Sequence, residues 1–117
     1  MKFKPGETNI ICRDAAASLA FYQDILGFTL VEREGDAIRL ENEGVVFLLL
    51  PFARAKRPRW EYVTTPDFSL DLMVDDLAQA YGYLEAKGVT FSKPWSPGDY
   101  SFVIQDPDGL CMEVIGL

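Results

Sequence analysis

Three carboxylate side chains lie in or directly before predicted strands: Glu7, Asp71 and Glu113. A carboxylate in such a place can act as a general base, help to hold a hard metal ion or pair with a cation. The chain has no histidine, and zinc and iron sites favour imidazole, so the sequence disfavours those metals. Cys12 and Cys111 lie in predicted strands. With no histidine to activate them, we expect both to be reduced core thiols.

Composition narrows the class of protein. The chain has 117 residues, of which 49% are apolar, and this suffices for one folded domain. Its 11 basic and 18 acidic residues give a net charge of −7, which disfavours a nucleic-acid partner. The longest apolar run, at Val45–Phe52, is far shorter than the ~20 residues of a membrane span. The first residues, MKFKPGET, lack the apolar core of a signal peptide, so we expect a cytoplasmic protein.

The chain divides into two similar halves within a single domain. Module one covers about 5–51, a connector covers about 52–67, and module two covers about 68–117. Each module is predicted to run strand, helix and three strands, which gives an α+β protein whose mixed sheet curves around a cavity. The expected strands are Thr8–Cys12, Phe28–Arg33, Ala37–Leu40, Val45–Leu50, Ser69–Val74, Val89–Lys93, Tyr100–Gln105 and Leu110–Ile115, with a further short strand near Trp60–Val63.

Each expected helix has a start and a stop signal. Asp14 suits the N-cap of the first helix, and Asp75 or Asp76 suits that of the second. Gly27 and Gly88 suit the residues that end them. The apolar stripe of the first helix is Leu19, Tyr22, Ile25 and Leu26, and that of the second is Leu77, Ala80, Tyr81 and Leu84.

Alternation along the first strand of each module separates two sheet faces. Glu7, Asn9 and Ile11 share one face of the first module, and Ser69, Asp71 and Met73 share one face of the second. The same face is expected to carry Val46, Leu48 and Ile115. A face with this many apolar residues should not be left wet, so we expect it to line a ligand cavity.

Four basic residues cluster between the modules: Arg54, Lys56, Arg57 and Arg59. The simpler interpretation is a solvated linker. Alternatively, the segment clamps an anionic group or makes a charge contact with a partner, and the chain is then a partner-binding module.

Three stretches of this sequence resemble a known family. They are SLAFYQDILGF in the first half, and VDDLAQAYGYLEAKGV and FVIQDPDGLCMEV in the second. They resemble the vicinal oxygen chelate superfamily, which includes glyoxalase I, extradiol dioxygenases, fosfomycin-resistance enzymes and bleomycin-resistance proteins. The resemblance implies paired β-α-β-β-β modules that form a cupped cavity, often in a homodimer, and says little about activity.

The resemblance also implies four ligand positions, which metal-dependent members place on the first and last strands of each module. In this sequence they are Glu7, Leu48, Ser69 and Glu113. Glu113 matches the family's carboxylate, and Glu7 is a carboxylate where histidine is usual. Because Leu48 and Ser69 are poor ligands, we expect no metal at this site and no other cofactor.

The leading hypothesis is a metal-free protein that binds a small organic molecule, similar to bleomycin-resistance-type proteins that sequester a basic or aromatic ligand. We expect a homodimer with neither nucleic acid nor membrane as a partner. The expected ligand-binding residues are Glu7, Asn9, Leu48, Trp60, Ser69, Asp71, Trp95, Tyr100, Phe102 and Glu113.

The alternative is an enzyme, a divergent glyoxalase-like lyase or isomerase. In that case Glu113 or Glu7 acts as the general base beside a weakly bound Mg²⁺ or Mn²⁺.

Overall fold

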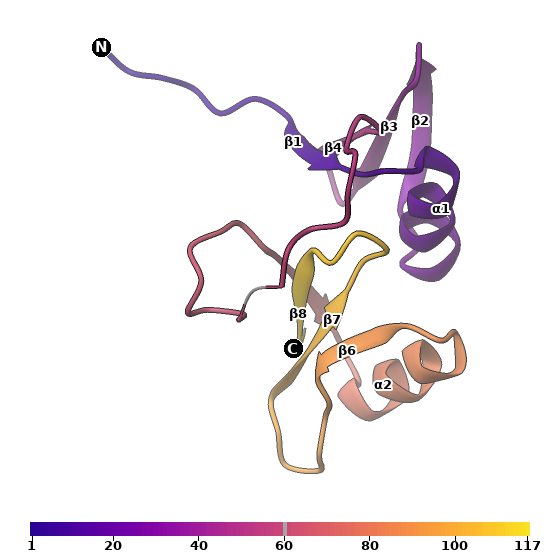
Figure 1. Cartoon of the computed structure of the whole chain (residues 1–117). Helices are drawn as coiled ribbons and strands as arrows, with labels where there is room; N and C mark the ends of the chain where they lie inside the picture. Colours follow the sequence, from indigo (N-terminus) through magenta and orange to yellow (C-terminus); the bar gives the residue numbers. More distant parts are fainter. Residues whose placement is uncertain (60) are drawn as a thin grey trace. The chain divides into compact units, whose positions relative to one another are not determined.

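The computed structural model describes residues 1–59 and 61–117, which form two compact units, Met1–Lys56 and Arg57–Leu117 (Figure 1). Each unit runs strand, helix and three strands, and each forms a four-stranded mixed sheet. The α+β class and the paired modules predicted from the sequence are thus confirmed. The strands are divided between two sheets, one in each unit.

The first unit contains a sheet in the order β1-β4-β3-β2, with a helical segment against one side (Figure 1). β1 pairs with β4 in parallel, and the other pairs are antiparallel. Its elements are β1 (Thr8–Ile11), α1 (Ala15–Leu19), η1 (Ala20–Ile25), β2 (Thr29–Glu34), β3 (Ala37–Asn42) and β4 (Val45–Leu50).

The second unit repeats this arrangement in the order β5-β8-β7-β6, with β5 parallel to β8. Its helix packs against β8. Its elements are β5 (Leu70–Val74), α2 (Leu77–Ala86), β6 (Thr90–Lys93), β7 (Ser101–Gln105) and β8 (Cys111–Gly116). Where a short strand was expected near Trp60–Val63, the structure has a turn over residues 62–64, and Trp60 itself lies outside the described residues.

Aspartate caps and glycine stops bound both helical segments, as predicted. The Asp14 carboxylate accepts hydrogen bonds from the backbone N–H groups of Ala16 and Ala17, and Asp76 accepts one from Gln79. Gly27 and Gly88 follow the helices with φ of 80° and 75°, a left-handed conformation that favours glycine.

The first helix differs from the prediction in its second half, where η1 is a π-helix. The backbone N–H of Leu26 donates to the carbonyl of Phe21 at 3.0 Å, a wider turn than the α-helix makes. Phe21 and the next residue, Tyr22, are both buried, and their rings meet edge to face at 5.1 Å. Consecutive α-helical residues point about 100° apart, and the wider turn brings the directions of these two adjacent side chains somewhat closer together.

In both sheets the side that faces the helix forms the core. Ile38, Leu40 and Leu49 are fully buried in the first unit, as are Ile104 and Met112 in the second. We call the side of each sheet turned away from its helix the open face. Cys12 and Cys111 are buried reduced thiols, as predicted.

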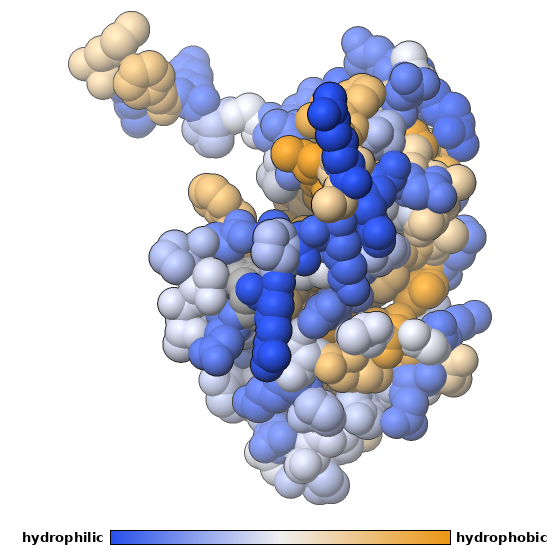
Figure 2. Space-filling model, viewed as in Figure 1, coloured by the Kyte–Doolittle hydropathy of each residue, from blue (hydrophilic) through white to orange (hydrophobic). Residues whose placement is uncertain are grey.

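The surface of the described residues adds two observations. No helix among them is both long and apolar enough to cross a membrane. The N-terminal segment extends away from β1, and Met1 and Phe3 leave apolar side chains exposed near its tip (Figure 2).

Candidate functional site

The open face of the first sheet carries a row of four paired residues. Strand register places Asn9 beside Leu48, Leu48 beside Arg39, and Arg39 beside Glu32. Glu7, two residues before Asn9, extends the same alternation. The predicted grouping of Glu7, Asn9 and Leu48 on one face therefore matches the register, and Arg39 lies within that group.

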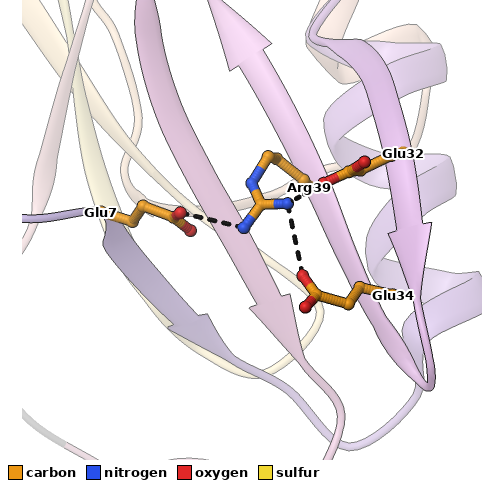
Figure 3. Close-up of polar contacts among 4 residues, drawn as sticks. All are labelled: Glu7, Glu32, Glu34 and Arg39. Atoms are coloured by element: carbon orange, nitrogen blue, oxygen red, sulfur yellow. Dashed lines mark hydrogen bonds and ion pairs between the residues drawn. The ribbon is translucent and has the colours of Figure 1, made fainter.

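Arg39 joins three carboxylates on this open face (Figure 3). Its Nη2 donates to Glu7 Oε1 at 2.9 Å, and its Nη1 lies 3.4 Å from Glu34 Oε2. Nη1 also pairs with Glu32 Oε1. The hydrogen bond to Glu7 raises the pKa of Arg39, burial acts in the opposite direction, and the charges of the three carboxylates raise it further. The guanidinium is thus a fixed cation, with more negative than positive charge around it.

The corresponding row in the second sheet has a different pattern of charge. Asp71 pairs with Glu113, Glu113 with Val103, and Val103 with Lys93. Two carboxylates therefore lie side by side on β5 and β8. Val103, which is buried, takes the place that Arg39 holds in the first unit.

Two hydroxyl groups bind the Glu113 carboxylate. Ser101 Oγ donates to Oε2 at 2.6 Å, and Tyr62 OH donates to Oε1 at 3.2 Å. Burial raises the pKa of Tyr62 above its usual value near 10.0, and the neighbouring charges of Glu113 and Asp71 raise it further; a hydrogen bond with Ser69 acts in the opposite direction. Tyr62 therefore stays a neutral donor at physiological pH.

Two hydrogen bonds between Glu61 and Thr65 close the turn that contains Tyr62. The backbone N–H of Thr65 donates to the Glu61 carbonyl at 3.0 Å, and that of Glu61 donates to Thr65 Oγ1 at 3.0 Å. An ion pair between Arg57 and Asp67 spans the same segment. One of the four clustered basic residues, Arg57, thus contributes to the fold.

The predicted site residues on the open face of the second unit are Ser69, Asp71 and Glu113. Ser69 precedes β5, where alternation places it on the same face as Asp71, and its hydrogen bond with Tyr62 agrees with that placement. These three, with Tyr62 and Ser101, form one polar group within the unit. Burial differs among them, since Ser101 is 2% exposed whereas Asp71 and Ser69 are open to solvent.

The structure separates three of the four predicted aromatic residues from this group. Phe102 is fully buried on the helix side, where its ring lies 5.3 Å from that of Tyr81. Trp95 lies 6.0 Å from the same Tyr81 ring, and its indole N–H donates to the Asp99 carbonyl. Tyr100 precedes β7 and is 74% exposed. Trp60 lies outside the described residues.

Three residues that contact the site were not predicted as part of it: Glu32, Glu34 and Ser101. The β2–β3 hairpin does contain a signal for the first two. Glu32 and Arg39 lie on the two strands that the Gly35-Asp36 turn joins, and they pair directly across the hairpin. Opposite charges are favoured at such a cross-strand pair. The sequence gives no comparable signal for Ser101. A single serine at the start of a strand does not indicate a carboxylate partner.

A separate groove of about 420 Å³ lies beside the first helix. Leu19 and Gln23 from the helical segment and Arg33 and Asp36 from the β2–β3 hairpin line it. It is on the helix side of the first unit and does not include the Arg39 group.

The four ligand positions do not fit a divalent metal. Glu7 is bound to Arg39 and Leu48 has no donor atom, while Glu113 is bound by two hydroxyl groups. Across residues 1–59 and 61–117, no group of three or more His, Cys, Asp or Glu side chains is disposed to hold a metal ion. Ser69 alone would leave a shell short of the oxygen ligands that Mg²⁺ or Mn²⁺ takes.

Known proteins resemble this chain in sequence and, for solved structures, in fold. The chain is 36% identical to the uncharacterized protein YaeR of Escherichia coli, over 90% of this chain and 89% of that protein. It is 26% identical to a lactoylglutathione lyase of Schizosaccharomyces pombe over 97% of this chain, but spans only 47% of that enzyme. Leishmania major glyoxalase I superposes with a TM-score of 0.76 at 17% identity, over 94% of this chain and 84% of that one, which shows a shared fold.

The match to a family extends over almost the whole sequence. The family model of the Glyoxalase/Bleomycin resistance protein/Dioxygenase superfamily matches residues 4–114. This range runs from before β1 into β8, so it covers nearly all of both β-α-β-β-β units and all four of the ligand positions. The chain therefore belongs to the glyoxalase, bleomycin resistance protein and dioxygenase superfamily.

Proposed function

We propose that this protein binds a small organic molecule that carries a cationic group and an aromatic ring, without a metal. The observation that carries the proposal is the excess of carboxylates on both open faces. Three carboxylates surround one guanidinium in the first unit. In the second unit Asp71 lies beside Glu113, to which two hydroxyl groups donate hydrogen bonds. A cationic ligand is the natural complement of such a face.

The second unit supplies more than charge to such a ligand. The ring of Tyr62 lies at the Glu113 carboxylate, where it can stack on a planar group or face a cation. Ser69 and Asp71 are exposed there and offer hydroxyl and carboxylate oxygens. Asn9 and Leu48 contribute an amide and an apolar surface in the first unit. Roles for Trp60, Trp95, Tyr100 and Phe102 stay predictions.

A ligand screen tests this proposal. Basic aromatic compounds are titrated into the protein and followed by tryptophan fluorescence and calorimetry. Each of the variants Glu113→Gln and Asp71→Asn should weaken a binding compound by about tenfold, the loss of one charge-assisted contact. Glu85→Gln, on the exposed side of α2, removes the same charge outside the site and should leave the affinity unchanged. If no compound binds more tightly than about 1 mM, the proposal fails.

A glyoxalase-like lyase is the second candidate. The likeness to a lactoylglutathione lyase favours it, with Glu113 or Glu7 as the base. The test is turnover of lactoylglutathione with and without added Mg²⁺ or Mn²⁺. Turnover that is lost in Glu113→Gln would establish the lyase in place of a binding protein.

The resemblance also implies a homodimer, and we propose one. Ile11 on β1 and Met73 on β5 are 62% and 54% exposed on the open faces, so apolar surface is available there. Sedimentation of the full chain over a range of concentrations measures the oligomeric state. A monomer at every concentration would contradict this part of the proposal.

A further inference from the structure

We infer that Arg39 is a resident cation of the first unit: it binds the carboxylate that stands at a ligand position and so prevents a metal ion from binding there. The inference concerns the first unit alone. It does not depend on the organic ligand proposed above, and a failed ligand screen would leave it standing.

Arg39 contacts carboxylates from two different parts of the first unit. Glu7 comes from the segment before β1, and Glu32 and Glu34 come from β2, while Arg39 lies on β3 between them (Figure 3). Glu7 binds Nη2 at 2.9 Å, and both β2 carboxylates contact Nη1. The guanidinium fork therefore binds carboxylates from β2 and from the segment before β1 at one point on the open face.

The Arg39 group carries a net negative charge. Three carboxylates and one guanidinium leave an excess of two negative charges. Without the guanidinium, the three carboxylates would repel one another and would need another cation. Oxygen ligands of this kind suit Mg²⁺, Ca²⁺ or Mn²⁺, and flexible glutamate side chains can converge on such an ion.

Arg39 occupies the place that a metal ion would need beside Glu7. In the described residues the carboxylates are spread around the guanidinium fork and no three acidic side chains are disposed to hold a metal. Arg39 itself is half-buried, with 21% of its side chain exposed, so it is held within the sheet surface. A metal could bind to Glu7 only by displacing this side chain from three ion pairs.

The test is a titration with Mn²⁺ alone, followed by calorimetry and by the electron paramagnetic resonance signal of free Mn²⁺. The wild type should show no binding at Glu7. Arg39→Gln should gain affinity for Mn²⁺ by at least about tenfold, because it leaves an oxygen-rich site without its cation. Adding Glu7→Gln to Arg39→Gln should remove most of that gain.

Arg33 provides a matched control. It lies on β2 between Glu32 and Glu34 and lines the groove on the helix side, so Arg33→Gln makes the same charge change on the opposite face of the sheet from the three carboxylates. This variant should bind Mn²⁺ no better than the wild type. The inference is overturned if the wild type binds as tightly as Arg39→Gln, if neither binds, or if Arg33→Gln gains as much.

A second measurement keeps the inference testable if Arg39→Gln does not fold. In the wild type, the guanidinium N–H resonances of Arg39 should be resolved and slow to exchange because Glu7 and Glu32 hold the fork. They should not broaden when Mn²⁺ is added. In Glu7→Gln the Nη2 signals should collapse, and if they are unchanged, or are averaged already in the wild type, Arg39 is not held as inferred.

Discussion

The two units differ in which of their two ligand positions holds a carboxylate. In the first unit the first-strand position is Glu7 and the last-strand position is Leu48; in the second unit the corresponding residues are Ser69 and Glu113. Each unit therefore retains one carboxylate, but on a different strand. The partners differ as well, since a guanidinium binds Glu7 whereas hydroxyl groups bind Glu113.

Burial explains why the partners differ. Arg39, which pairs with Leu48, has 21% of its side chain exposed to solvent. Val103, which pairs with Glu113, is 3% exposed. A long cationic side chain fits the first position and would be crowded in the second. The repeat thus keeps the backbone scaffold while each open face neutralises its carboxylate with what its own surroundings allow.

Exchanging these two positions should give the largest effect. Val103→Arg puts a charge and a longer side chain into a closely packed position, and we expect a loss of about 3 kcal/mol or more in the free energy of unfolding. The reverse change, Arg39→Val, should leave the unfolding midpoint close to that of the wild type, because its ion pairs lie at the surface. Denaturant unfolding measures both variants, and equal effects at the two positions would break the comparison.

Removing the buried hydroxyl group should have a smaller effect. In Ser101→Ala the Glu113 carboxylate loses its hydrogen bond at 2.6 Å, with an expected cost of about 1–3 kcal/mol in the free energy of unfolding. Ser92→Ala is the matched control, since Ser92 Oγ accepts from the neutral Gln105 amide at 2.8 Å and should matter less. A Ser101 variant as stable as the Ser92 variant would show that the charge of Glu113 does not strengthen its hydrogen bond.

Tyr62→Phe should have the smallest effect, about 1 kcal/mol near neutral pH, since it removes a longer hydrogen bond. The pKa of Tyr62 is raised in the folded protein. The stability linked to this group is therefore fully present below the usual pKa of 10.0 and is lost as the pH rises through the folded value. Unfolding measured from neutral to alkaline pH should show a shallower alkaline loss in Tyr62→Phe than in the wild type.

Tyr100→Phe serves as the control for that titration. Tyr100 is 74% exposed, so its replacement should leave the alkaline loss of stability unchanged. If Tyr62→Phe and Tyr100→Phe give the same pH profile, the Tyr62 hydroxyl is not bound to the carboxylate as described.

The fold was largely predictable because its signals are local. Asp14 and Gly27 bound the first helix, as their cap and stop chemistry predicts. Alternation correctly placed Ile11 on the open face of β1, while the next residue back, Ile10, lies in the core. The π-helix was not predicted. It depends on how Phe21 and Tyr22 share one core, which periodicity along a single segment does not specify.

The site was predictable only where strand alternation decides the face. Asp71 and Glu113 were placed on one face, and the strand register agrees. Phe102 was expected near the ligand, whereas it packs on the helix side; Ser101, one position earlier, is the residue that reaches Glu113. A shift of one residue changes the face, and the sequence alone does not fix that register.

Metal analysis of the wild-type protein, purified from cells without chelators, tests the central claim most directly. If Arg39 and the hydroxyl groups have taken over the carboxylates at the ligand positions, any metal should be well below one ion per chain and unaffected by Glu7→Gln or Glu113→Gln. A stoichiometric metal that is lost in both variants would contradict the account, because Glu7 and Glu113 would then be metal ligands.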